Sequence, residues 1–297
     1  MRTNDKNLKN AEWIKSCEDR FADRFYSIAE DICQKRSLRI VRLFGPTCSG
    51  KTTAAQILIS IFESFGKKAH VISIDDFFYS REKLLRLSRE KGNDGIDYDS
   101  PDTIDLEVLE KFTEEIFESS VVHCPIFDFK EGKCVGYREM SIDDNDIFIF
   151  EGIQANYPNV ISILSSHGSA SIYIAPQSDV CAWGQTFEPN ELRLMRRLVR
   201  DYYFRGSKPE FTFMLWESVR ENEEKNIFPY VNSDYTVDSA MEYEIGVLKP
   251  YLRDIVDRMD KNDKYYPTAL NIIDKISGVD EIPSELILDG MLYCEFV

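Results

Sequence analysis

No apolar run in the 297-residue sequence approaches the roughly 18 residues of a membrane-spanning helix. The amino terminus also lacks the continuous apolar core of a signal peptide, because Arg2 and later charged residues interrupt the first apolar stretch. The seven cysteines are odd in number and include no C-x-x-C pair, which argues against a disulfide framework and a zinc site. These absences predict a reduced, cytoplasmic protein with no membrane segment.

The sequence is also poor in positively charged residues. The chain has 36 Lys and Arg against 52 Asp and Glu, a net charge of −16. A surface of this charge repels polyanions at long range, so we expect neither nucleic acid nor an anionic membrane as a partner. Hydrophobic residues make up 43% of the chain, enough to fill the core of one large domain. The sequence leaves the oligomeric state open, with a homo-oligomer among the options.

The spacing of apolar residues gives the expected elements. Intervals of three and four within residues 11–35 predict a helix that packs on the main domain. Apolar, β-rich runs occupy residues 38–44, 70–74, 147–150 and 171–175, each separated by a helix-length segment. Because these runs lack polar alternation, they predict a mostly parallel sheet covered by helices on both faces.

A phosphate-binding motif follows the first of these strands. The segment GPTCSGKTT at residues 45–53 matches G-x-x-x-x-G-K-[ST] and opens a predicted helix, which is the context that the motif requires. Its backbone N–H groups would bind phosphate oxygens, the lysine would reach the β and γ phosphates, and the threonine hydroxyl would bind Mg²⁺. We expect ATP or GTP, with Mg²⁺, to contact Gly45, Pro46, Thr47, Cys48, Ser49, Gly50, Lys51, Thr52 and Thr53.

The motif and the strand pattern together predict an α/β, three-layer P-loop NTPase fold with a mostly parallel sheet. We expect residues 1–37 to form an amino-terminal helical extension and residues 38–237 to form the P-loop domain. Helical spacing of apolar residues beyond this predicts a carboxy-terminal helical segment, residues 238–297, packed on the same domain. A helical lid is expected at residues 190–208.

Acidic residues follow two of the predicted strands, where ligands of doubly wound domains collect. Asp75 is a candidate general base for an acceptor hydroxyl, although Asp76 could serve instead, and helix capping would explain either residue without catalysis. Glu151 ends the strand at residues 147–150, where P-loop enzymes hold an acid that orients Mg²⁺ or its waters. Donor and acceptor groups are therefore expected at one edge of the sheet.

The segment NELRLMRRLVRDYYFR, residues 190–205, is a strongly basic helix in an acidic protein. Its spacing would present two cationic stripes, one through Arg193 and Arg197 and the other through Arg196 and Arg200. Arginines on a helix are usually exposed to solvent and have no specific function. A lid that closes on the transferring phosphate is favoured, because guanidinium groups stabilise charge on the γ-phosphoryl group.

Six blocks occur in the order found in the uridine kinase and phosphoribulokinase family, which the chain resembles. They are GPTCSGKTT at 45–53, SIDDFF at 73–78, DYDSPD at 97–102, PIFDF at 125–129, FEG at 150–152, and RRLVRD at 196–201 with Arg205 and Gly206. A later stretch, residues 216–244, looks like a bacterial uridine kinase-like branch. The resemblance implies a kinase that transfers a γ-phosphoryl group to a hydroxyl of a nucleoside such as uridine or cytidine.

The resemblance also implies individual roles. Asp75 matches the catalytic acid of the family and Glu151 the acid that ends its Walker B strand. Arg197 and Arg200 match lid arginines, and Tyr98, Asp99 and Phe127 match residues that contact the acceptor nucleoside. We expect Lys51, Arg197 and Arg200 to stabilise charge in catalysis, Arg205 to meet the donor phosphates and Asp76 to contact the acceptor.

The chain departs from the family pattern on the acceptor side. No histidine follows Phe129, where uridine-cytidine kinases read the pyrimidine edge, and Phe127 replaces a tyrosine. Two alternatives therefore stay open: a kinase for a non-nucleoside sugar, sugar phosphate or polyol, and a non-catalytic nucleotide-binding regulatory protein. A GTPase switch is not supported, because residues 260–263 only approximate the Asn-Lys-x-Asp motif that reads guanine.

Overall fold

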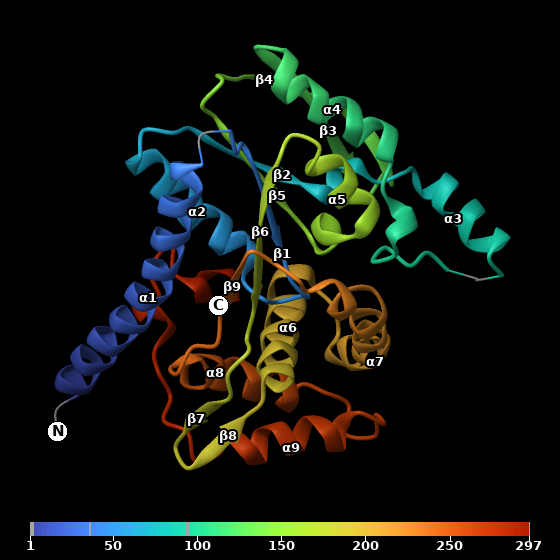
Figure 1. Cartoon of the computed structure of the whole chain (residues 1–297). Coiled ribbons are helices and arrows are strands. Elements are labelled where there is room, and N and C mark those ends of the chain that lie inside the picture. The colour runs from blue at the N-terminus through green and yellow to red at the C-terminus, as the bar shows by residue number, and fades with distance from the viewer. Residues whose placement is uncertain (1–2, 36, 93–94, 297) are drawn as a thin grey trace.

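The computed structural model describes residues 3–35, 37–92 and 95–296 of the chain. At its centre lies a five-stranded sheet in the order β2-β5-β1-β6-β9, whose neighbouring strands all run parallel (Figure 1). The strands are β1 (Ile40–Phe44), β2 (Ala69–Ser73), β5 (Ile147–Glu151), β6 (Ser169–Ala175) and β9 (Tyr235–Asp238). The sequence predicts the first four, and β9 is a short edge strand that it does not predict.

Consecutive residues of the central strands enter two separate cores, as a sheet buried on both faces requires. In β1, Val41 and Leu43 belong to one core and Ile40 and Phe44 to the other. Helices α1 (Thr3–Gln34) and α2 (Lys51–Ser64) contribute to the first core, whereas α4 (Leu106–Glu118) and α5 (Pro158–Leu164) contribute to the second. This arrangement confirms the predicted three-layer α/β fold.

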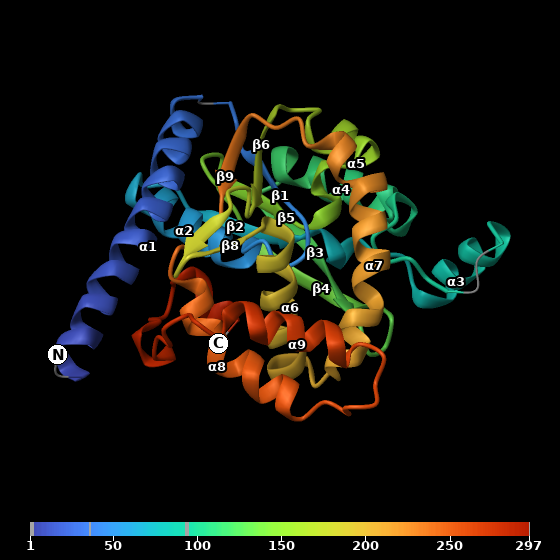
Figure 2. The same ribbon diagram turned by 90° about the horizontal axis from the view of Figure 1, so that it is seen from below.

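Helix α1 runs along one side of the molecule and packs on α2 (Figures 1 and 2). It is longer than the predicted helix at residues 11–35, because the polar residues before Ala11 continue the same helix. Its apolar face, which includes Ile14, Phe21 and Phe25, is buried, and burying side chains of this size contributes roughly 1.5–3 kcal/mol each.

Four further helices gather below the sheet in Figure 1 and face the viewer in Figure 2. They are α6 (Pro189–Arg205), α7 (Pro209–Asn226), α8 (Glu244–Asp257) and α9 (Tyr266–Ile276). Helix α6 contacts both α7 and α8, and its residues Leu192, Met195, Leu198 and Val199 are buried. The predicted lid helix is therefore packed on both sides, rather than lying free over the site.

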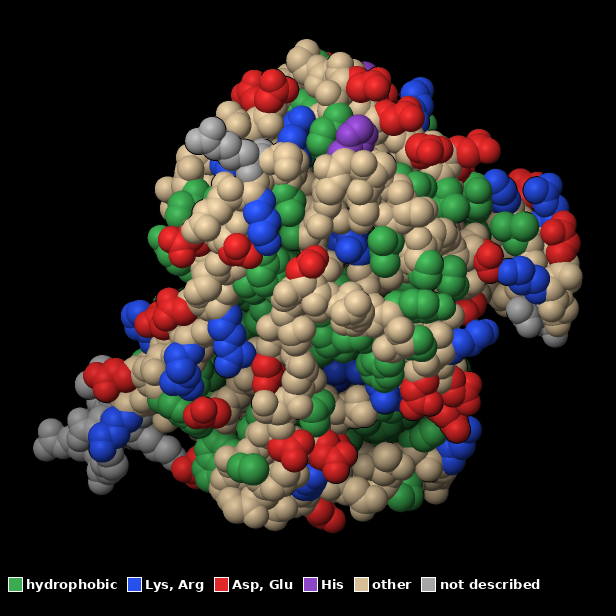
Figure 3. Space-filling model, in the orientation of Figure 1, with side chains coloured by type: hydrophobic (Ala, Val, Ile, Leu, Met, Phe, Trp, Pro, Cys, Tyr) green, Lys and Arg blue, Asp and Glu red, His purple; other side chains and the backbone are tan. Residues whose placement is uncertain are grey.

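The remaining elements stand outside the main sheet. Strands β3 (Val121–Asp128) and β4 (Lys133–Ser141) form an antiparallel hairpin, and β7 (Val180–Ala182) pairs with β8 (Gln185–Phe187). Helix α3 (Arg81–Glu90) projects from the body, which the surface view also shows (Figures 1 and 3). Within the described ranges no helix is long and apolar enough to cross a membrane.

Candidate active site

The phosphate loop joins β1 to α2, and neither of its two motif glycines has room for a Cβ atom. A Cβ atom on Gly45 would lie 2.0 Å from the backbone oxygen of Ile174. Gly50 has a φ of 91°, and a Cβ there would lie 2.3 Å from a side-chain carbon of Leu292. Cys48 also adopts a positive φ, 57°. Left-handed residues in such a loop turn successive N–H groups toward one point, which creates an anion-binding nest.

Two buried arginines of α6 hold the outer side of this loop. Arg193 Nε donates to the Thr47 carbonyl at 3.0 Å, and Arg196 Nη1 donates to the Cys48 carbonyl at 3.3 Å. With its carbonyls held this way, the loop keeps its N–H groups for a ligand.

Each of these arginines is also balanced by a buried glutamate. Arg193 pairs with Glu223 of α7, and Arg196 pairs with Glu244 of α8, at 2.9 Å in the second pair. The expectation of two exposed cationic stripes is thus wrong for Arg193 and Arg196, because α7 and α8 cover that part of α6.

One cavity of about 360 Å³ joins the phosphate loop to the neighbouring strand ends. Among the predicted site residues, it is lined by Thr47, Cys48, Ser49, Gly50, Lys51, Thr52, Asp75, Tyr98, Asp99, Glu151, Arg197, Arg200 and Arg205. Gly45, Pro46, Thr53, Asp76 and Phe127 are not among its lining residues. The register explains the convergence, because Leu43 of β1 and Ser73 of β2 both pair with Glu151, so these strands end at the same level.

The donor side of the cavity fits a nucleotide with Mg²⁺. Lys51 Nζ donates to the carbonyls of Gly45 and Pro46, both at 3.0 Å, and Ser49 Oγ is buried with no partner in the described chain. No group of three or more His, Cys, Asp or Glu in the described residues is arranged to hold a metal. Mg²⁺ needs only one or two protein oxygens beside phosphate and water, which Thr52 and Glu151 offer.

Asp75 lies in the single-turn helix η1 (Ile74–Phe77) after β2 and faces the cavity. Burial, and then the nearby Glu151 carboxylate, raise the pKa of Asp75 to about 7, against an opposing effect of Lys51. Burial also raises the pKa of Glu151, and Lys51 again opposes it. A carboxyl with a pKa near neutrality can accept a proton from a hydroxyl and release it at physiological pH.

Asp76 points elsewhere. Its Oδ1 accepts a hydrogen bond from the backbone N–H of Phe127 at 3.1 Å, which ties η1 to strand β3. Asp76 is not among the residues that line the cavity, so we expect Asp75 rather than Asp76 to meet the acceptor hydroxyl.

Phe127 is not among the residues that line the cavity either. Its side chain is 7% exposed and packs with Phe78 and Phe129, at ring-centroid distances of 5.7 and 5.2 Å. Phe78 and Phe129 line the cavity in its place. An aromatic wall is present as expected, but different rings form it, because the β3–β4 hairpin turns Phe127 into the core.

The loop that carries Tyr98 and Asp99 is held from behind by the segment after β5. Gln154 Nε2 donates to the Tyr98 carbonyl at 2.7 Å, and Tyr157 Oη donates to the Asp99 carbonyl at 2.7 Å. With these carbonyls held, Tyr98 and Asp99 present their side chains to the cavity. Burial, followed by Asp97, raises the pKa of the Asp99 carboxyl.

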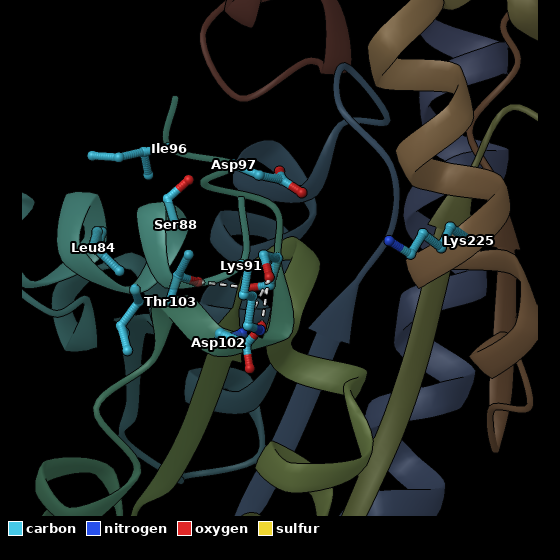
Figure 4. A pocket seen from close by; sticks show the side chains of 10 residues that line it. Leu84, Ser88, Lys91, Ile96, Asp97, Asp102, Thr103 and Lys225 are labelled. Carbon is cyan, nitrogen blue, oxygen red and sulfur yellow. Dashed lines mark hydrogen bonds and ion pairs between the residues drawn. The ribbon is translucent and has the colours of Figure 1, made fainter. Parts of the chain in front are cut away.

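Residues beside Tyr98 and Asp99 in the same loop line a smaller cavity of about 150 Å³ (Figure 4). Asp97 and Asp102 line this second cavity, where Lys91 forms an ion pair with Asp102. Lys225 reaches toward it from α7.

Three arginines from the end of α6 face the phosphate loop across the large cavity. Arg197 and Arg200 both bond the Asp201 carboxylate, at 3.2 and 2.8 Å, and Arg205 lies 3.9 Å from it. Sharing one carboxylate fixes these guanidinium groups and leaves part of their positive charge unbalanced. That charge is suited to a transferring phosphoryl group.

Two polar residues of the cavity were not predicted from the sequence. Glu295, in the short helix η6 (Leu292–Glu295), lines the cavity and accepts a hydrogen bond from Thr53 Oγ1 at 3.4 Å. No local signal marks it, because it lies 242 residues from its partner. Gln154 stands three residues after Glu151, so its position after the strand was the one available signal.

A phosphate loop, a buried carboxyl after the next strand along the chain and an arginine cluster on α6 all line one cavity, and these are the parts of a P-loop kinase of a small molecule. Residues 40–241 match the model of the Phosphoribulokinase / Uridine kinase family. Because the match spans more than half of the sequence, the chain belongs to this family.

Several known proteins are similar to this chain. A uridine kinase of Schizosaccharomyces pombe is 30% identical over 173 residues, which cover 58% of this chain and 33% of that protein. A uridine kinase of Mycoplasma genitalium is 28% identical over 185 residues, covering 61% and 74% respectively. Among solved structures, a Silicibacter protein described as a fructose transport system kinase aligns with a TM-score of 0.52 at 19% identity, covering 71% of this chain and 98% of that one. This chain thus spans about a third of the fission yeast relative.

Proposed function

We propose that the protein transfers the γ-phosphoryl group of ATP to a hydroxyl of a nucleoside such as uridine or cytidine, with GTP as the alternative donor. The observation that carries this proposal is the placement of Asp75 in one cavity with Lys51, Arg197 and Arg200. A proton acceptor and three cations then lie on the two sides of a transferring phosphoryl group, as phosphoryl transfer requires.

In this mechanism the Asp75 carboxylate takes the proton of the acceptor hydroxyl. The hydroxyl oxygen forms a bond to the γ-phosphorus while the bond from that phosphorus to the β–γ bridging oxygen breaks, and the nucleoside diphosphate leaves. Lys51, Arg197 and Arg200 stabilise the negative charge that spreads over the phosphoryl oxygens. Thr52 and Glu151 would hold Mg²⁺, which supplies charge neutralisation on the phosphates when bound.

Support for a nucleoside acceptor comes from the cavity wall and from the relatives. Tyr98, Phe78 and Phe129 present aromatic surface, and Asp99 offers a carboxylate that accepts hydrogen bonds from ribose hydroxyls. The curated relatives above are uridine kinases. A non-nucleoside sugar or polyol is the second candidate, because Phe127 is packed in the core and no histidine follows Phe129.

The test is the rate of ADP formation from labelled ATP with a panel of nucleosides, free sugars, sugar phosphates and polyols. We expect acceptor-dependent turnover with at least one nucleoside and no turnover by D75N. D76N is the matched control, since the amide that it introduces retains an oxygen that can accept from the Phe127 N–H. Turnover confined to sugars or polyols would replace the nucleoside assignment, and equal activity of D75N would remove Asp75 from the mechanism.

We also propose a reducing, cytoplasmic setting for this activity. All seven cysteines are free, and Cys48 lies within the phosphate loop. A setting that keeps thiols reduced would protect that loop from oxidation.

A further inference from the structure

Gln154 combines burial, a cavity position and an unpaired oxygen. It lies in the short helix η3 (Ile153–Asn156) after β5, is 2% exposed, and lines the large cavity together with Asp75, Tyr98 and Asp99. Its Oε1 atom is buried and has no hydrogen-bond partner in the described part of the chain. A buried acceptor without a partner costs free energy, so its retention calls for an explanation.

The orientation of the Gln154 amide is fixed by its neighbour. Nε2 donates to the Tyr98 carbonyl at 2.7 Å, and only the NH₂ group of the amide can bond a carbonyl oxygen. Turning the amide over would place two oxygens in contact. The unpaired atom is therefore the oxygen, and whatever satisfies it must donate a hydrogen bond.

We propose that Gln154 is a specificity-determining residue of the acceptor site, and that its Oε1 accepts a hydrogen bond from a second hydroxyl or N–H group of the acceptor molecule. This inference rests on the proposed kinase function and narrows its substrate class. The same side chain holds the Tyr98 carbonyl, so acceptor recognition and the position of the Tyr98 loop are coupled through one amide.

The acceptor selected in this way carries at least two hydrogen-bond donor groups. One hydroxyl receives the phosphoryl group beside Asp75, and another meets Gln154. A phosphate or carboxylate group cannot itself donate to Oε1, so the second donor must be another hydroxyl or an N–H group. Nucleosides, sugars and polyols meet this requirement, whereas acids and alcohols with a single hydroxyl do not.

The experiment compares acceptors that differ by one hydroxyl in the wild type, Gln154→Met and Tyr157→Phe. Methionine keeps the length of the side chain and loses both polar atoms. Tyr157→Phe removes the bond to the Asp99 carbonyl and so loosens the same loop, but Tyr157 is not among the residues that line the cavity. It is therefore the control for a purely structural role. The compounds are a ribonucleoside, its 2′-deoxy and 3′-deoxy forms, and matching deoxy sugars.

In the wild type, we expect the loss of one particular hydroxyl to lower kcat/KM about tenfold or more. In Q154M the same loss should change kcat/KM by less than about threefold, because the partner oxygen is gone. In Y157F, all acceptors should weaken together and the wild-type discrimination should remain. If Q154M discriminates among the analogues as the wild type does, or if Y157F loses discrimination equally, Gln154 does not read the acceptor.

The failure of this inference can be told from the failure of the proposed function. Turnover of neutral sugars without nucleosides would end the nucleoside assignment, and the deoxy sugars would then test Gln154 in the same way. Turnover restricted to acceptors with a single donor group would overturn the Gln154 inference itself. Calorimetric titration of the same compounds gives the comparison without turnover, and the same loss of affinity for the deoxy analogues in Q154M as in the wild type would also overturn it.

Discussion

Replacing the proposed base Asp75 with asparagine should make the ligand-free protein more stable as well as inactive. Burial beside Glu151 raises the pKa of Asp75 from 3.8 to about 7. The folded state therefore holds this proton more tightly than the unfolded chain does. Below the pKa that Asp75 has in the unfolded chain, this residue does not change the free energy of unfolding. As the pH rises from about 4 to about 7 the free energy of unfolding falls, and above about pH 7 it is lower by a constant amount.

The size of the effect follows from the shift. A pKa change of one unit corresponds to about 1.4 kcal/mol, so a rise from 3.8 to about 7 lowers the free energy of unfolding by up to about 4 kcal/mol above pH 7. The asparagine side chain in D75N carries no charge and avoids this loss. The advantage of D75N should therefore grow by about 1.4 kcal/mol per pH unit between about pH 4 and pH 7 and then level off. At about 2 °C per kcal/mol, the difference in Tm at pH 8 reaches about 8 °C.

Thermal unfolding of both proteins, without nucleotide, at half-unit steps from pH 4 to pH 8.5 measures this dependence. Asp179→Asn, a change at an exposed aspartate, is the control for loss of a charge at the surface, and its curve should run parallel to that of the wild type. Two results would refute the claim that burial and the nearby Glu151 destabilise the ionised form of Asp75. One is a difference in Tm between D75N and the wild type that stays constant with pH, and the other is a D75N protein that is less stable than the wild type at pH 8.

Three further predictions concern the residues around the donor. Glu223→Gln should lower the free energy of unfolding by about 3–5 kcal/mol in urea titrations, because Arg193 then stays buried without its charged partner. The control, Glu224→Gln at an exposed position, should lower it by less than about 1 kcal/mol. Arg200→Lys should lower kcat by about 10- to 100-fold in steady-state assays with little change in the KM of the acceptor, because lysine lacks the planar fork; an unchanged kcat would separate Arg200 from the transferring group. Glu295→Gln should lower the KM of ATP several-fold, because it removes a negative charge beside Thr53, and a raised KM would instead make Glu295 part of the donor site.

The sequence was most informative where structure is set locally. The phosphate loop, the four central strands and the basic helix could be predicted, because apolar runs and a fixed glycine spacing determine them within short segments. Asp75 and Asp76 could not be separated, since adjacent residues in a single-turn helix point in different directions that only the turn itself decides. Asp76 bonds the Phe127 backbone, whereas Asp75 faces the cavity.

Features that depend on distant contacts could not be predicted. Arg193 and Arg196 are buried because α7 and α8 bring Glu223 and Glu244 to them, and nothing in the spacing of α6 records those partners. Phe127 enters the core because of the hairpin, whose two strands the sequence pattern did not reveal. The unsatisfied oxygen of Gln154 becomes visible only when every hydrogen bond around it is known.

The most direct test of the central claim, that Asp75 and the phosphate loop share one phosphotransfer site, is ³¹P NMR of the products formed from ATP and a nucleoside by the wild type and D75N. The wild type should yield the nucleoside monophosphate and ADP in equal amounts. D75N should form at least about 100-fold less of both while binding ATP within about threefold of the wild-type Kd. ATP hydrolysis to inorganic phosphate without a phosphorylated acceptor, or full transfer by D75N, would contradict the account.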